Sequence, residues 1–177
     1  KTAVVVPAPV KAGRDALQRG DVDEASRTAN QLLAENTHDL HALRLLLDIE
    51  LEKQNGGRAD MLATRLLESY GAAGDRIAAS ALIAEFRSHR TMHQFLARAA
   101  ALLERWGDRE SAIDLLEQVA EAESGTPNAL TALLRLANLR RSAGDRAGAM
   151  EALQRALVQP ACSPEWRRRI DSAIASL

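Results

Sequence analysis

Residues 96–120 read LARAAALLERWGDRESAIDLLEQVA, in which two segments with apolar residues at three- and four-residue spacing flank the dipeptide Gly107-Asp108. Apolar residues at this spacing predict amphipathic α-helices. Glycine readily takes the left-handed conformation that ends a helix, and aspartate accepts hydrogen bonds from the first free amides of the next one. The stretch therefore predicts a tight helical hairpin.

The same dipeptide recurs along the chain, which indicates an internal repeat. It stands again at Gly20-Asp21, Gly74-Asp75 and Gly144-Asp145. Five residues after each of the four glycines stands an alanine, at Ala25, Ala79, Ala112 and Ala149. A small side chain at this point lets the two helices of a hairpin cross closely. From Gly74 onward the turn glycines are 33 and 37 residues apart, as expected for stacked helical hairpins.

The periodicity and its interruptions predict an all-α chain of about ten helices without strands. The expected helices span residues 8–19, 22–35, 39–53, 59–73, 76–89, 92–106, 109–123, 128–143, 146–158 and 164–177. Pro7 and Pro9 follow three consecutive valines, so residues 1–9 are expected to form an extended lead-in to a repeat domain at 10–177. The last helix is expected to cap the array.

One interval breaks the period, because Gly20 and Gly74 are 54 residues apart, neither one repeat nor two. In one arrangement helix 39–53 is unpaired, and a kink or a changed superhelical twist lies near residues 36–58. In the other arrangement helix 39–53 pairs with helix 59–73, and the Gly-Asp turns fall between repeat units for part of the chain. The sequence leaves both open.

A glycine-containing turn, an alanine five residues later and a period near 34 resemble the tetratricopeptide-repeat family over about three quarters of the chain. The small first-helix residue of that family is matched by Gly13, Ala100 and Ala137 but replaced by Leu67, and its large aromatic survives only as Tyr70. The repeats are therefore degenerate. The resemblance implies a right-handed superhelix of helical hairpins that serves as a non-enzymatic protein-protein interaction scaffold.

Four cationic residues stand nine positions before the turn glycines: Lys11, Arg65, Arg98 and Arg135. The resemblance places this position in a concave groove that binds extended peptides and their acidic ends. Further groove candidates are Gln94, Arg105, Asn138 and Arg141. The alternative is that these are ordinary solvated side chains, as the pair Arg65 and Glu68 on one helix face suggests. Leu134 occupies the place of an expected lysine four residues before Asn138, so a terminal-carboxylate clamp is not expected.

Composition excludes several other classes of function. The chain has 177 residues, 46% of them hydrophobic and 27% charged, and its net charge of -1 provides no general attraction to nucleic acid or membranes. No apolar run is long enough to span a bilayer. Cys162 is the one cysteine, so an internal disulfide is excluded.

Glu85, His89 and His93 follow one another at intervals of four residues, but they are expected to be surface residues and not metal ligands. Neither a cofactor nor catalysis is expected.

Three further hypotheses concern the origin of the chain, its alternative function and its self-association. A high arginine and alanine content favours a bacterial origin, in the cytoplasm or the periplasm. The chain begins at Lys1 and a proline-containing lead-in, so the alternative function is a soluble structural or assembly module of a larger bacterial envelope or membrane protein, in secretion or polysaccharide export. The third hypothesis is self-association through Cys162 or through the first hairpin.

Overall fold

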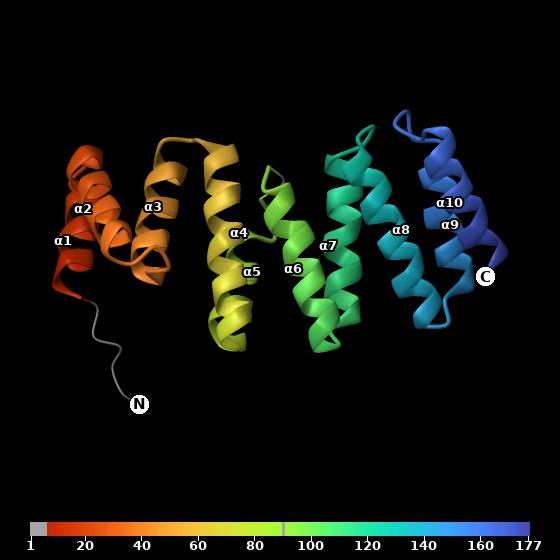
Figure 1. The fold of residues 1–177 in the computed structure, drawn as a ribbon, viewed down its shortest axis with the longest axis horizontal. Helices are drawn as coiled ribbons and strands as arrows, with labels where there is room; N and C mark the ends of the chain where they lie inside the picture. Colours follow the sequence, from red (N-terminus) through yellow and green to blue (C-terminus); the bar gives the residue numbers. More distant parts are fainter. Residues whose placement is uncertain (1–6, 90) are drawn as a thin grey trace. The chain divides into compact units, whose positions relative to one another are not determined.

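The computed structural model describes residues 7–89 and 91–177. This part of the chain forms ten α-helices and no strand, so the predicted all-α fold is confirmed (Figure 1). The helices are α1 (Ala8–Gln18), α2 (Val22–Glu35), α3 (Leu40–Glu52), α4 (Gly56–Ala73), α5 (Arg76–Phe86), α6 (His93–Trp106), α7 (Arg109–Ala122), α8 (Pro127–Ser142), α9 (Arg146–Leu157) and α10 (Pro164–Ala175). The chain divides into two compact units, and the boundary between Leu82 and Ile83 falls within α5.

The Gly-Asp turns have the predicted geometry. All four glycines have positive φ, between +71° and +84°, and each helix before them ends there. The following aspartate caps the next helix: in the turn between α6 and α7, Asp108 accepts a hydrogen bond from the amide of Ser111 at 3.2 Å. Asp21, Asp75 and Asp145 accept equivalent bonds at 2.8–3.0 Å. Each cap satisfies an amide that the helix itself leaves free.

In the first unit α1 packs against α2, α2 against α3 and α3 against α4, and α1 also touches α3. Helix α3 thus lies between α2 and α4, so the arrangement in which it is unpaired is wrong. Its turn to α4 uses different residues from the other hairpins: Gln54 takes φ 55°, and Asn55 accepts a hydrogen bond from the amide of Arg58 at 3.4 Å. This cap starts α4 at Gly56, three residues earlier than the sequence predicts. A change of twist near residues 36–58 stays a prediction.

The first helix begins inside the expected lead-in. Ala8 and Pro9 belong to α1, with Pro7 at its N-cap. Proline is tolerated in a first helical turn because the missing N–H would have no partner within the helix. These two residues, which the sequence assigns both to the lead-in and to the helix expected over 8–19, therefore belong to the helix, and residues 1–6 of the lead-in lie outside the described part of the chain.

Gly13 allows close packing of α1 in the first unit. An added Cβ would lie 2.5 Å from Cδ2 of Leu45 on α3 and 3.3 Å from Cγ2 of Thr28 on α2. Helices can approach each other this closely only where a side chain is missing. The small residue that the repeat pattern predicts at this position thus has a packing role.

We expect Gly13→Val to destabilise the first unit by about 1–3 kcal/mol, because a branched side chain overpacks the contact with Leu45. Gly13→Ala should cost less, since the terminal methyl of Leu45 can rotate away and alanine favours the helix by about 1 kcal/mol. Urea unfolding followed by circular dichroism measures both. Gly57→Ala is the control, because a Cβ there meets open space. A Gly13→Val protein as stable as the parent would contradict this packing.

In the second unit α6 packs against α7, α7 against α8, α8 against α9 and α9 against α10. Its interior consists largely of leucine and alanine, with Phe86 and Phe95 meeting edge to face at a centroid distance of 5.8 Å. Ile170 anchors α10 and is fully buried. Small and branched apolar residues let these short helices pack closely.

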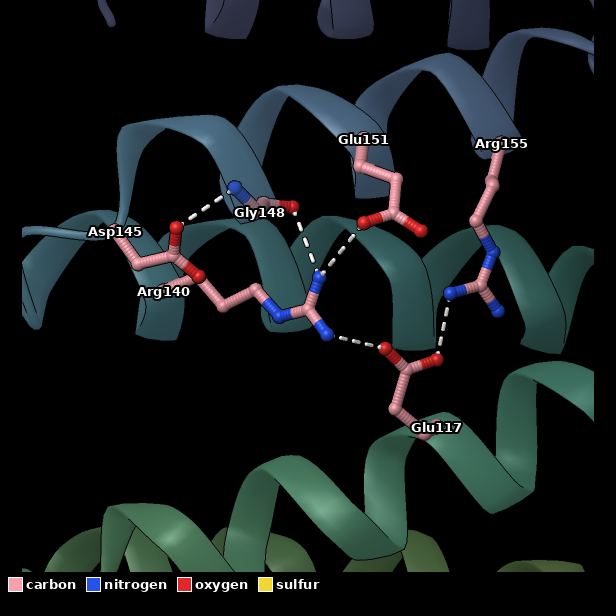
Figure 2. A network of polar contacts seen from close by, with 6 residues as sticks. All are labelled: Glu117, Arg140, Asp145, Gly148, Glu151 and Arg155. Carbon is pink, nitrogen blue, oxygen red and sulfur yellow. Dashed lines mark hydrogen bonds and ion pairs between the residues drawn. The ribbon is translucent and has the colours of Figure 1, made fainter.

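A carboxylate joins three helices of the second unit (Figure 2). Glu117 of α7 accepts a hydrogen bond from Nη2 of Arg140 on α8 at 2.7 Å and another from Nη1 of Arg155 on α9 at 2.6 Å. Arg140 also donates to the carbonyl of Gly148 at 3.1 Å and lies 3.6 Å from a carboxylate oxygen of Glu151. A Cβ on Gly148 would lie 2.1 Å from Oδ2 of Asp145 and 2.9 Å from Cδ of Arg140, so glycine leaves space for the capping carboxylate and for the arginine. These contacts of Glu117 with Arg140 and Arg155, called the Glu117 network below, fix α8 relative to α7 and α9.

We expect Glu117→Gln to lower the stability of the second unit by about 1–2 kcal/mol, because two partly buried guanidinium groups lose their shared counter-charge. The side chain of Glu117 is only 23% exposed, so water replaces the carboxylate poorly. Glu121→Gln on the same helix is the matched control, since Glu121 is exposed. Equal urea midpoints for the two variants would show that the network contributes nothing to stability.

Candidate functional site

A groove of about 490 Å³ lies between α8 and α10 in the second unit. Helix α8 lines it with Thr131, Leu134, Arg135 and Asn138, and α10 lines it with Trp166, Arg169 and Ala173. The lining residues of each helix are three or four positions apart, with one adjacent pair on α8, so each set occupies one helix face. The packing of α8 and α10 on α9 positions the two sets.

The groove combines an apolar surface with cationic and amide groups. Leu134, Trp166 and Ala173 are partly exposed and provide apolar area. The guanidinium of Arg169 lies 4.6 Å from the centroid of the Trp166 ring, a cation–π arrangement that orients the arginine. Asn138 is exposed, and its amide is both a hydrogen-bond donor and an acceptor. This combination suits a ligand with an apolar side chain next to a carboxylate.

Arg135 connects the groove to α6. Its Nη2 donates to Oε2 of Glu104 at 2.8 Å, and its Nη1 donates to the carbonyl of Ala97 at 3.5 Å. The side chain of Arg135 is 32% exposed and that of Glu104 is 43% exposed. Both groups are therefore accessible to water and to a ligand.

The structure brings only some of the predicted groove residues together. Arg135 and Asn138 line the groove, and Arg141 lies one turn further along α8, where its Nη1 donates to Oγ of Ser176 at 3.1 Å. The other five are exposed residues outside its lining: Lys11 on α1, Arg65 on α4, and Gln94, Arg98 and Arg105 on α6.

Arg65 is held by its own unit, because its Nη2 donates to the carbonyl of Thr37. Lys11 and Arg65 belong to the first unit, whereas Arg98 and Arg135 belong to the second. A continuous ladder of all four cations stays a prediction.

Sequence reasoning misses the wall that α10 contributes. The sequence predicts only that the last helix caps the array, and none of the predicted groove residues lies on it. The available signal is the spacing of Trp166, Arg169 and Ala173, which places an aromatic, a cation and a small residue on one helix face. No sequence pattern points to Glu104, because its partner Arg135 is 31 residues away.

Glu85 and His89 are exposed as expected, whereas His93 is half-buried. Its Nδ1 contacts Oε1 of Glu123, while Oε2 of Glu123 accepts from Oγ1 of Thr126 at 3.0 Å and from Nδ2 of Asn128 at 3.3 Å. The bond with His93, supported by those from Thr126 and Asn128, holds the pKa of Glu123 below its usual value against the opposing effect of burial. Within the described residues no group of three His, Cys, Asp or Glu side chains suits a metal ion.

We expect Glu123→Gln to lower stability at neutral pH and to have little effect in acid. A lowered pKa means that folding favours the ionised carboxylate, so its contribution is present above the ordinary pKa of 4.5 and is lost as the pH falls through the lower folded value. Urea midpoints of parent and variant should therefore differ at pH 7 and converge towards pH 3. A difference independent of pH would contradict the role of the charge, and Glu121→Gln serves as control.

The fold is similar to solved helical proteins. The crystal structure of MamA matches with a TM-score of 0.50 at 14% identity, covering 96% of this chain and 99% of that one. TTC0263, a thermophilic TPR protein in Thermus thermophilus, matches with a TM-score of 0.41 at 22% identity, covering 94% and 97%. No family model and no curated protein matches the sequence.

The ten helices, the capped Gly-Asp turns and the similarity to MamA define a tetratricopeptide-like helical-repeat fold, as the repeat pattern predicts. At these identities the similarity concerns the fold alone. Among the described helices none is both long and apolar enough to cross a membrane.

Proposed function

We propose that the protein is a non-enzymatic interaction scaffold that binds an extended, acidic segment of a protein partner in the groove between α8 and α10. The observation that carries this proposal is the lining of the groove, where Arg135 and Arg169 border the apolar surface of Leu134, Trp166 and Ala173. A helical-repeat fold presents such surfaces on rigid elements, so a partner is bound without large rearrangement.

The dimensions of the groove suit a short peptide stretch. The α8 wall runs from Thr131 to Asn138, which is about 10 Å at 1.5 Å per helical residue. About three residues of an extended chain span this length. An apolar side chain of such a segment would contact Leu134 and Ala173, and the amide of Asn138 would pair with its backbone.

The charge of this end of the chain favours an acidic partner. Residues 127–177 contain eight arginines and four acidic side chains, a net charge of +4, although the whole chain has -1. Local positive charge raises the association rate of an acidic segment and favours it over neutral competitors. Arg169 adds directional hydrogen-bond donors for a carboxylate.

The proposed role is binding and not catalysis. The lining residues of the groove include two arginines, an asparagine and a threonine, together with apolar side chains. None of these is a histidine, cysteine or carboxylate that could act as a general acid, a general base or an activated nucleophile.

We expect Arg169→Glu to weaken binding of an acidic peptide about tenfold or more, because a charge-assisted contact is replaced by repulsion. The probe is a fluorescein-labelled octapeptide of alternating leucine and glutamate, and its neutral counterpart has glutamine in place of each glutamate. Fluorescence anisotropy should show that the parent protein prefers the acidic probe.

Arg109→Glu is the matched control, since Arg109 is an exposed arginine in the first turn of α7 and lies outside the groove. Circular dichroism verifies that each variant is folded. The combined reversal of Arg98 and Arg135 should also abolish binding if the site extends to α6. Equal affinity of the parent for both probes, or an unchanged affinity after Arg169→Glu, would refute the proposed site.

A further inference from the structure

The two arginines of the groove differ in their surroundings. Arg169 lies over the ring of Trp166, whereas Arg135 is paired with Glu104 of α6 at 2.8 Å. Glu104 does not line the groove, but its carboxylate occupies Nη2 of Arg135, a donor on a side chain that does line it. One of the two cationic positions is therefore already bound by the chain itself.

The ion pair between Glu104 and Arg135 is exposed enough to separate. The side chain of Glu104 is 43% exposed, and that of Arg135 is 32% exposed, so water can solvate both groups when they separate. Arg135 keeps a second hydrogen bond, from Nη1 to the carbonyl of Ala97 on α6 at 3.5 Å, so its guanidinium stays tethered after Glu104 leaves. In the Glu117 network, by contrast, Arg140 is only 19% exposed and bound by several partners.

We propose that Glu104 is an internal competitor for the partner: its carboxylate occupies Arg135 until an acidic group of the bound segment displaces it. This inference rests on the proposed function, because it concerns the same groove. Glu104 would thus set the affinity of the groove for acidic segments, and its specificity for them, without contacting the apolar part of the ligand. A segment must present a carboxylate that replaces Glu104 at Arg135, since a neutral segment gains nothing from breaking the pair.

The gain in affinity expected on removing Glu104 follows from the exposure of the ion pair between Glu104 and Arg135. Partly exposed ion pairs are weak, so removing the competitor should tighten acidic ligands by about two- to fivefold. The effect should be confined to ligands that carry a carboxylate. It should also require Arg135, because without this arginine there is no position to compete for.

The test compares Glu104→Gln and Glu104→Ala with the parent protein, using the same acidic and neutral octapeptides. The alanine variant is needed because a glutamine amide can still accept a hydrogen bond from Arg135. Both variants should bind the acidic probe about two- to fivefold more tightly and the neutral probe unchanged. Glu110→Gln, an exposed glutamate on α7, controls for the change in net charge.

A double-mutant cycle separates competition from a general effect. In the Arg135→Gln background, Glu104→Ala should no longer tighten the acidic probe. Unchanged or weaker binding by Glu104→Ala, or the same tightening with and without Arg135, would overturn the inference. If the Glu104 inference fails in this way but Arg169→Glu still weakens binding of the acidic probe, the proposed groove stands. A parent protein that binds neither probe refutes both the groove and the inference.

Discussion

The hydrogen bond from the first free amides of a helix to the aspartate side chain before it is the interaction on which this structure depends. At Gly107-Asp108 the glycine ends α6 with φ +84°, and Asp108 caps α7 within the same turn. Because the turn is so short, successive helices must lie side by side, and their apolar faces then meet. The same device recurs at Gly144-Asp145, where it sets the pairing of α8 with α9.

The position of the groove on α8 follows from this pairing and from the partly buried charges of the Glu117 network. Helix α8 uses its apolar face for the core, and the Glu117 network holds Arg140 on the side towards α7 and α9. The remaining face, with Arg135 and Asn138, is left to line the groove opposite α10. A terminal helix that is anchored chiefly by Ile170 can therefore present Trp166 and Arg169 to a ligand.

Local patterns predict most of the fold, because helix ends are decided by neighbouring residues. The Gly-Asp turns locate helix boundaries to within a few residues, and the repeat spacing indicates the fold class. The turn at Gln54 and Asn55 is harder, since a non-glycine residue takes positive φ there and the cap is an asparagine. The pairing of α3 requires contacts between helices, which no local pattern contains.

The candidate site is only half predictable for the same reason. Arg135 and Asn138 share a helix face, so spacing finds them together. Trp166 and Arg169 come from another helix, and the link between Arg135 and Glu104 depends on how α6 meets α8. The role as a module of a larger envelope assembly, self-association and the cellular compartment stay predictions of the sequence.

The most direct test of the account is nuclear magnetic resonance of the indole N–H of Trp166 during titration with the acidic octapeptide. The account predicts that this signal, assigned with Trp166→Phe, shifts in a saturable manner, while the indole of Trp106, which does not line the groove, serves as reference. A peptide that binds while the Trp166 signal stays unchanged would contradict the proposed site.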